Sequence, residues 1–245
     1  MHSLSIVIPA YNEEANIAQA VRRVSHTAQQ LGTDYEIIVV NDGSRDRTGE
    51  MVRELAASIP CLKLVEHFPN RGYGGALKAG FAAASKELIA FIPADNQYDF
   101  NEIRQLVDQL TPDVVLVSGW RANDVDNFMR QINRWGWNLI IRILFGYLLR
   151  DIDCGFKVFR RRALDHIPIQ SNGAMLDTEM LAQLRARGHK FAEVPVTHLP
   201  RTAGSPTGAN LKVVVRAFRD LSRFRLRLWR ELRDEKRAAH TQAKP

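Results

Sequence analysis

The fold is decided by the stretch Leu4-Ser-Ile-Val-Ile-Pro9, together with Tyr35-Glu-Ile-Ile-Val-Val40 and Leu88-Ile-Ala-Phe-Ile92. Each is a short apolar run without polar alternation, which is typical of a strand covered on both faces. Between these runs, apolar residues recur at helical spacing in residues 13–31, 46–57 and 72–85. This alternation predicts an α/β fold with a mostly parallel sheet flanked by helices.

The rest of the chain extends this pattern. Residues 62–65 and 114–117 predict further strands, followed by helices at 128–149 and 176–187 and strands at 155–159 and 191–196. Since no linker separates the two halves, we expect one domain over residues 1–208. A basic amphipathic helix with a frayed tail is expected over residues 209–245.

The composition is that of an ordinary globular protein. The chain has 245 residues, of which 45% are hydrophobic and 25% charged, and it has two cysteines. These proportions exclude collagen-like, disordered and disulfide-stapled chains, and they favour a reducing cytosol. We expect no secretory signal and no membrane crossing, because no apolar stretch reaches the roughly 18 residues that a crossing needs.

The net charge of +7 is concentrated at the C-terminal end, where residues 201–245 hold 12 basic and 4 acidic residues. A body without net positive charge argues against a nucleic-acid partner. In the tail, basic residues step by three or four along one helical face: Arg216, Arg219, Arg223, Arg227 and Arg230. Such a helix suits an anionic membrane surface, and the alternative is a helix docked on its own domain with a solvated arginine face.

A second segment also favours membrane contact. Residues 134–149 are apolar around nearly the whole helix, with Arg142 as the exception and with Trp and Tyr at the two ends. A helix of this kind must be buried or must meet lipid, and aromatic ends are common at membrane interfaces. Packing against the C-terminal helix is the alternative, and the two helices together could form a lipid-facing platform.

Polar residues follow three of the predicted strands: Tyr11-Asn12-Glu13, Asn41-Asp42-Gly43 and Asp95-Asn96-Gln97. Ligands of parallel sheets bind at the carboxyl ends of the strands, so these clusters predict a binding site. Asp95 and Gln97 stand at i and i+2, where their oxygens could hold Mg²⁺ or Mn²⁺, although such residues also populate ordinary turns.

The glycine cluster Gly72-Tyr-Gly74-Gly75 opens a predicted helix. Its backbone N–H groups could approach a diphosphate, aided by Arg71 or Lys78. The equally weighted alternative is a tight turn that uses glycine for a positive φ.

Taken in order, these motifs resemble family 2 glycosyltransferases with the GT-A fold. The resemblance is carried by Ile6-Val-Ile-Pro9-Ala-Tyr11-Asn12-Glu13, Val39-Val-Asn-Asp42-Gly-Ser44, Asn70-Arg-Gly72-Tyr-Gly-Gly-Ala76, Ala94-Asp95-Asn-Gln97 and Asp153-Cys154-Gly-Phe-Lys157. Within the family, the chain looks most like the dolichol- and polyprenyl-phosphate sugar synthases, over roughly residues 4–207.

This resemblance implies a nucleotide-diphosphate sugar donor and a divalent cation, Mg²⁺ or Mn²⁺, held by Asp95 and Gln97. It implies that Arg121, Arg130 and Arg201 grip the acceptor phosphate or the donor diphosphate. Because an ionised acceptor phosphate needs no strong protein base, we expect Asp153 to be structural or sugar-binding, with a general base as the alternative. The remaining donor contacts are expected from Pro9, Tyr11, Glu13, Val40, Asp42 and Ala94.

The sequence departs from the family pattern at two places. Pro93 stands where the family motif Asp-Ala-Asp-x-Gln has its first Asp, and the lysine often found shortly after the late arginine is missing after Arg201. The cation is then expected to rest on Asp95, and the diphosphate to meet fewer positive charges than in a typical relative.

The expected activity is inverting transfer of a sugar to a polyprenyl phosphate by a peripheral protein at the cytoplasmic membrane face. The acceptor phosphate needs no strong base, because its second pKa is about 6. The alternatives are a family 2 transferase with a glycan or glycolipid acceptor, and an inactive nucleotide-binding protein docked on a membrane. Sugar, base, acceptor length and oligomeric state stay open.

Overall fold

The computed structural model describes residues 2–123, 125, 128–165, 167–173, 175–201 and 211–242. Within these ranges, the side chains of residues 130, 211–219, 236 and 238–242 lie outside the description. For Arg130, Arg216 and Arg219, the structure therefore describes the backbone and not the side chains on which the predictions depend.

The described residues form a mixed sheet of seven strands in the order β3-β2-β1-β4-β6-β5-β7. Pairing is parallel except that β6 runs antiparallel to both β4 and β5. The prediction of a mostly parallel sheet is thus confirmed. The strands are β1 (Leu4–Ala10), β2 (Tyr35–Asp42), β3 (Leu62–His67), β4 (Leu88–Phe91), β5 (Val114–Arg121), β6 (Lys157–Arg160) and β7 (Lys190–Val196).

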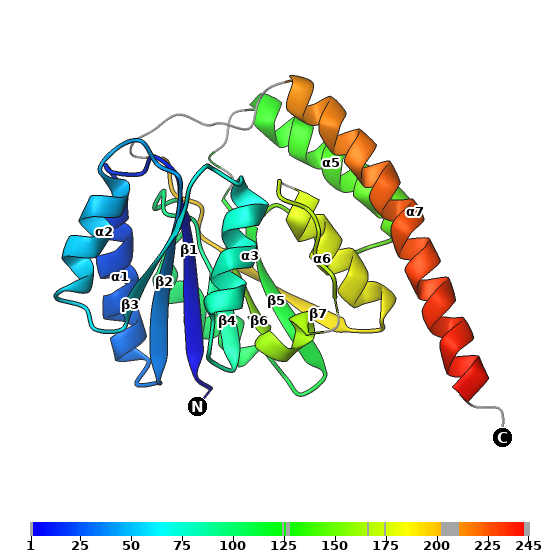
Figure 1. The fold of residues 1–245 in the computed structure, drawn as a ribbon, viewed down its shortest axis with the longest axis horizontal. Coiled ribbons are helices and arrows are strands. Elements are labelled where there is room, and N and C mark those ends of the chain that lie inside the picture. Colours follow the sequence, from blue (N-terminus) through cyan, green and yellow to red (C-terminus); the bar gives the residue numbers. More distant parts are fainter. Residues whose placement is uncertain are drawn as a thin grey trace.

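Helices cover both faces of the sheet (Figure 1). One face packs against α1 (Ile17–Gln30), α2 (Thr48–Ala56) and α4 (Ile103–Asp108), which follows a 3-10 turn at Phe100–Glu102. On the other side of the sheet lie α3 (Tyr73–Ala83), α5 (Phe128–Phe145) and α6 (Met175–Ala186), and α7 (Leu211–Gln242) packs on α6 and α5. A short 3-10 turn at Arg161–Leu164 links β6 to the segment before α6. Because both faces are covered, the strands can be apolar on both sides, as their sequences predicted.

Element boundaries differ from the sequence prediction where local turns intervene. Helix α1 begins at Ile17 rather than Glu13, because Asn12 adopts a positive φ of 55° and the Glu13 carbonyl accepts from the N–H of Asn16. Helix α5 ends at Phe145, where Gly146 follows with a φ of 77°. Helix α4 was not predicted, and α7 continues to Gln242, into the tail that was expected to be frayed.

The C-terminal helix α7 packs on its own domain through its apolar side. Leu221, Phe224 and Leu228 are buried in the core that α6 and α5 share, and the Phe224 ring stacks on Phe145 with centroids 5.4 Å apart. An ion pair of 2.6 Å between Arg187 and Glu235 adds to this packing. For these residues, the structure shows the helix docked on its own domain, and membrane contact of the exposed side of α7 stays a prediction.

Helix α5 is buried on one side and exposed on the other. Ile141 is fully buried in the core that α5 shares with α6 and α7, whereas a helical stripe of large apolar residues faces outward: Phe128, Met129, Ile132, Trp135, Leu139 and Ile143. We call these six residues the α5 stripe. None of the helices in the described part of the chain combines the length and apolar content that a membrane crossing requires.

Close packing of α3 on the sheet gives a test of this architecture. A Cβ on Gly80 would lie 2.3 Å from Val7 Cγ1 and 3.2 Å from Val40 Cγ2, so Gly80→Ala should lower the free energy of unfolding by about 1–3 kcal/mol. The control is Gly136→Ala in α5, where the new Cβ meets nothing within 4 Å and better helix propensity should be neutral or stabilising. Urea denaturation measures both, and equal stability of the two variants would contradict the packing described.

Candidate active site

The order of the strands places the site between β1 and β4. From β1 the chain moves outward to β2 and β3, then returns to place β4 on the other side of β1. Loops after such a switch point diverge and leave room for a ligand at the carboxyl edge. Glu13 follows β1 and Asp95 follows β4, and the side-chain amide of Asn96 donates to the Asn16 carbonyl at 3.2 Å, which ties the two loops together.

Glu13 and Asp95 share this part of the edge. Burial raises the pKa of Glu13, and the negative charge of Asp95 raises it further. Burial also raises the pKa of Asp95, which is 7% exposed, while the nearby Arg201 guanidinium opposes that rise. Glu13, predicted to bind the donor, and Asp95, predicted to hold the cation, therefore lie close enough to interact.

Arg201 lies between the two predicted metal ligands. Its Nη2 is 2.6 Å from Asp95 Oδ2 and 3.3 Å from Gln97 Oε1. The Gln97 amide is turned so that its oxygen faces the guanidinium, while its Nε2 lies 3.2 Å from His198 Nε2. Two hard oxygens thus converge on a positive charge, which is the arrangement that Mg²⁺ or Mn²⁺ needs.

The donor set also has a limit. Among the described residues, no cluster of three or more His, Cys, Asp or Glu side chains could hold a metal ion. The residues fit a cation that takes two protein ligands and completes its shell with water and substrate oxygens. The ring of Pro93 packs against Gly155, where a Cβ would lie 2.6 Å from Pro93 Cγ.

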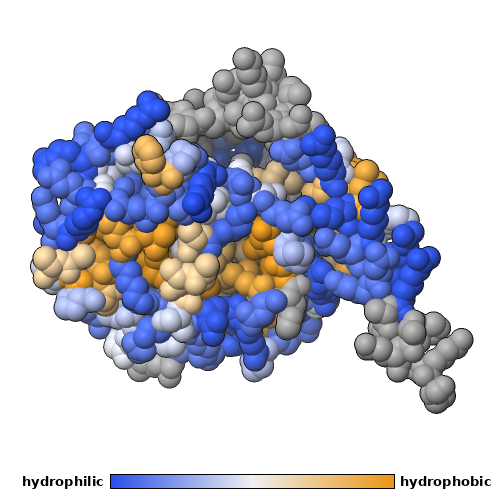
Figure 2. Space-filling view, in the orientation of Figure 1, coloured by the Kyte–Doolittle hydropathy of each residue, from blue (hydrophilic) through white to orange (hydrophobic). Residues whose placement is uncertain are grey.

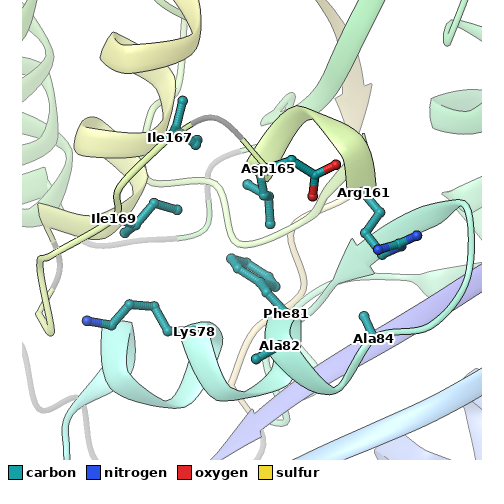
Figure 3. A pocket seen from close by; sticks show the side chains of 9 residues that line it. Lys78, Phe81, Ala82, Ala84, Arg161, Asp165, Ile167 and Ile169 are labelled. Carbon is teal, nitrogen blue, oxygen red and sulfur yellow. The ribbon is translucent and has the colours of Figure 1, made fainter.

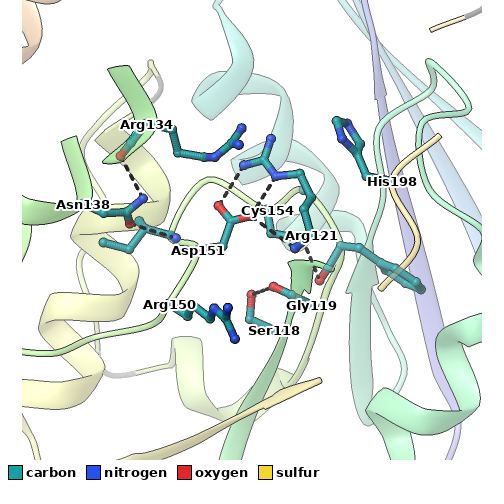
Figure 4. A network of polar contacts seen from close by, with 12 residues as sticks. Ser118, Gly119, Arg121, Arg134, Asn138, Arg150, Asp151, Cys154 and His198 are labelled. Atoms are coloured by element: carbon teal, nitrogen blue, oxygen red, sulfur yellow. Dashed lines mark hydrogen bonds and ion pairs between the residues drawn. The ribbon is translucent and has the colours of Figure 1, made fainter. Parts of the chain in front are cut away.

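A second cluster lies at the end of β5. Asp151 accepts from Nε and Nη2 of Arg121, at 2.7 Å each, in a two-pronged ion pair (Figure 4). Burial opposes the charge of both groups, yet this pair raises the pKa of Arg121 and lowers the pKa of Asp151. The predicted phosphate-binding residue Arg121 is therefore held in one orientation.

Next to this pair is a cavity of about 310 Å³ lined by three arginines and two tryptophans. The guanidinium carbon of Arg150 lies 3.8 Å from the centre of the Trp120 ring. Burial and the charge of Arg121 lower the pKa of Arg134, as expected where like charges crowd. A cavity of this kind favours an anion. Its lining is Trp120, Arg121, Gln131, Arg134, Trp135, Asn138, Arg150 and Asp151.

Asp153 follows this cluster, and its side chain is exposed between two buried neighbours, Ile152 and Cys154. Desolvation by the surrounding protein and the charges of Asp151 and Asp177 raise its pKa to about 6. Near neutral pH, Asp153 carries its charge.

The residues predicted to hold the base and ribose lie at the ends of β1 and β2. Pro9 and Val40 are aligned in the β1–β2 register, Tyr11 is exposed, and Asp42 is buried. The Asp42 carboxylate accepts from the N–H of Arg71 at 2.9 Å and lies 2.8 Å from His67 Nδ1. The side chains of Val40 and Ala94 lie in the core, so any contact with a donor would come from their backbone.

The glycine cluster serves a close approach of two segments. The Asn172 carbonyl accepts from the N–H of Gly74 at 2.9 Å, and a Cβ on Gly74 would lie 2.8 Å from the Asn172 backbone. Gly72 has a φ of 81°. The start of α3 is thus capped by residues 171–173, which agrees with the tight-turn alternative.

Lys78 lies away from Asp95 and the arginine cavity. Its ammonium donates to the Gln170 carbonyl at 3.1 Å, at one end of a separate cavity of about 330 Å³ beside α3 (Figure 3). Figure 2 shows a face with many hydrophilic residues, in which hydrophobic residues lie in the hollow beside α3. A donor-binding role for Lys78 stays a prediction, as does that of Arg130, whose side chain lies outside the described residues.

Three residues of the site were missed by the sequence analysis. Arg134 follows Arg130 by one helical turn, so the two residues lie on the same face of α5. This spacing could have predicted that Arg134 lies beside Arg130 in the site. Arg150 stands in no motif, and neither does His198, which is buried beside Gln97. All three come close to the site through tertiary contacts.

Similar chains are found among sequences and structures. A curated undecaprenyl-phosphate 4-deoxy-4-formamido-L-arabinose transferase of Enterobacter sp. is 31% identical over 216 residues, covering 87% of this chain and 65% of the relative. The glycosyltransferase AglD of Haloferax volcanii is 31% identical over 207 residues, covering 81% of this chain and 33% of the relative. The chain thus spans less than two thirds of the length of these relatives.

Solved structures agree with the fold. Mannosyl-3-phosphoglycerate synthase of Rubrobacter xylanophilus has a TM-score of 0.69 at 19% identity, covering 96% of this chain and 76% of that chain. Glucosyl-3-phosphoglycerate synthase of Mycobacterium tuberculosis, solved with Mn²⁺, UDP and phosphoglyceric acid, has a TM-score of 0.67 at 23% identity, covering 91% and 78%. The model of Glycosyl transferase family 2 matches residues 5–168. The chain belongs to glycosyl transferase family 2.

Proposed function

We propose that this protein transfers a sugar from a nucleotide-diphosphate donor to a polyprenyl phosphate, with inversion at the anomeric carbon, at a membrane surface. The observation that carries the proposal is the arginine-lined cavity beside Asp151. One wall of this cavity is Trp135, which also belongs to the exposed α5 stripe. An anion site that adjoins an exposed apolar surface suits a phosphate at the end of a lipid.

The donor side of the proposal rests on Asp95, Gln97 and Glu13. Asp95 Oδ2 and Gln97 Oε1 would hold Mg²⁺ or Mn²⁺, which as a Lewis acid stabilises charge on the departing nucleoside diphosphate. Arg201, which now lies against Asp95, can reach an adjacent diphosphate with the same guanidinium. Its role would be to bind and orient that group.

The acceptor side rests on Arg121, Arg134 and Arg150. A phosphate monoester is mostly doubly ionised near neutral pH, since its second pKa is about 6. Its oxygen can attack without a protein base, so the work of the protein is to hold the two substrates in line. The Asp151 carboxylate fixes Arg121 in place, and the paired charges keep the pocket from repelling an anion.

Membrane contact is proposed for the outer surface of α5 and α7. Beside the α5 stripe, the exposed side of α7 carries Leu226 and Trp229 among Arg223, Arg225 and Arg230. Apolar side chains next to arginines suit an anionic lipid surface. We place this surface at the cytoplasmic face, as the resemblance implies. The name of the Enterobacter relative supports the same class of acceptor.

Donor and cation binding are tested by thermal shift and by Mn²⁺ titration followed by electron paramagnetic resonance. One of the UDP-, GDP- or dTDP-sugars should raise Tm by a few degrees when Mn²⁺ is present, because ligands that bind the native state stabilise it. Asp95→Asn should lower Mn²⁺ affinity by at least about tenfold, since even indirect partners of metal ligands cost that much.

Arg201→Ala is the matched variant. It removes the charge that competes with the cation, so Mn²⁺ affinity without nucleotide should rise. Unchanged Mn²⁺ binding in Asp95→Asn would contradict the metal assignment.

The acceptor pocket is tested by Arg134→Ala and Arg150→Ala in a transfer assay with polyprenyl phosphate. Each should raise the KM for the acceptor by about tenfold or more, which is the effect of losing a hydrogen bond to a charged group. The KM for the donor should stay within about twofold. Arg104→Ala, an exposed arginine of α4 on the opposite face of the sheet, is the control. Transfer that survives both pocket substitutions would favour a glycan or glycolipid acceptor.

Membrane contact is tested by co-sedimentation with anionic phospholipid vesicles. Ile143, in the α5 stripe, is 73% exposed, and Ile143→Glu should weaken vesicle binding by about tenfold, the effect of losing one buried apolar side chain. Phe68→Glu is the control, because Phe68 is 94% exposed but lies after β3, outside the stripe. If both variants bind vesicles as the unmodified protein does, the α5 stripe is not the contact surface.

A further inference from the structure

A buried lysine lies beneath the segment that presents Asp153. Lys157, the first residue of β6, is 0% exposed and is among the largest fully buried side chains. Its ammonium lies 3.1 Å from Asp177 Oδ1, in the first turn of α6, and 5.3 Å from the centre of the Phe91 ring. A buried ion pair is costly to form and is weak evidence for stability, so its presence here calls for another role.

The same ammonium holds the backbone on both sides of Asp153. It donates to the Ile152 carbonyl at 3.0 Å and to the Cys154 carbonyl. The side chains of Ile152 and Cys154 are buried, whereas the side chain of Asp153 between them is exposed. One donor that bonds the carbonyls before and after a residue fixes where its side chain points.

Asp177 is itself held in place. Tyr73, at the start of α3, interacts with Asp177, so the ion pair that joins β6 to α6 also lies next to α3. On the other side of the segment, the N–H of Gly155 donates to the Tyr98 hydroxyl at 3.3 Å, in the loop that follows Asp95. The position of Asp153 is therefore set relative to the donor side of the site.

We propose that the buried Lys157–Asp177 pair is a positioning device that fixes Asp153 toward the reacting sugar and sets the charge that Asp153 meets. The function of Asp153 in sugar binding rests on the proposed transferase activity, but the positioning itself does not. Lys157 touches no substrate in this account, and it acts through the backbone at Ile152 and Cys154.

The charges around Asp153 include both members of the Lys157–Asp177 pair, so the pKa of Asp153 depends on that pair. Asp151 precedes it and Asp177 lies on α6, and both charges raise its pKa, while Lys157 and Arg121 lower it. Arg134 on α5 and Tyr73 on α3 also interact with Asp153. Removing the lysine charge should raise the pKa of Asp153, and removing the Asp177 charge should lower it.

The test is a ¹³C-carboxyl NMR titration of the full chain, with Asp153→Asn assigning the resonance. Lys157→Met should move the Asp153 titration up by about one pH unit, and Asp177→Asn should move it down. The double variant Lys157→Met with Asp177→Asn should titrate near the unmodified protein and should fold, because removing both charges leaves neither one unpaired.

Matched controls are Lys190→Met and Asp113→Asn, which break an exposed pair of 2.8 Å at the other end of β5 and should leave the titration unchanged. If Lys157→Met does not fold, the proposal is still tested by the other two variants. The pKa of Asp153 should fall in Asp177→Asn and should return to the value of the unmodified protein in the double variant. Shifts in the same direction, or lower stability with an unchanged titration, would overturn the proposal.

Measurement of kcat and KM is the second test of the positioning role. In the double variant, kcat should fall by about 10- to 100-fold, with the KM for acceptor within about twofold, because a small misplacement of a positioned group costs that much. An unchanged kcat in an active enzyme would contradict the positioning role. If the unmodified protein shows no transfer but the opposite NMR shifts appear, the proposed function fails while the positioning stands.

Discussion

Two arginine–carboxylate pairs are the interactions on which the site depends. The expected donor and acceptor are both anions, whereas the carboxyl edge of the sheet presents acidic side chains. Arg201 at 2.6 Å from Asp95 and Arg121 at 2.7 Å from Asp151 balance those acids. With the carboxylates paired, the cavity beside Asp151 keeps a positive lining, and the oxygen ligands at Asp95 stay aligned for a cation. The edge can therefore accept substrates that bare carboxylates would repel.

Much of the fold could be predicted from local patterns. Strands such as Leu4–Ala10 are apolar on both faces, and each was predicted within a few residues. The antiparallel direction of β6 could not be predicted, because a four-residue strand carries no signal of its pairing partner. Helix α4 was not predicted, although Ile103, Leu106, Val107 and Leu110 recur at helical spacing, because this pattern covers only two turns.

The site was predictable as far as its motifs extend. Asp95, Gln97 and Glu13 follow strands whose carboxyl ends meet, so their proximity follows from strand order. Arg134 and Arg150 become part of the site only when α5 and the segment after it fold over the end of β5. The same holds for α7, whose sequence suits lipid or protein equally, and whose apolar side chains pack on α5 and α6.

The central claim is most directly tested by a comparison of acceptors. The full chain would be incubated with Mn²⁺, a nucleotide sugar and vesicles that carry either undecaprenyl phosphate or undecaprenol, and the lipids would be analysed by mass spectrometry. The account predicts a hexose or pentose added to the phosphate-bearing lipid and none added to the alcohol, since three arginines line the cavity that receives the acceptor. Equal glycosylation of the alcohol, or glycosylation of neither lipid with any donor, would contradict it.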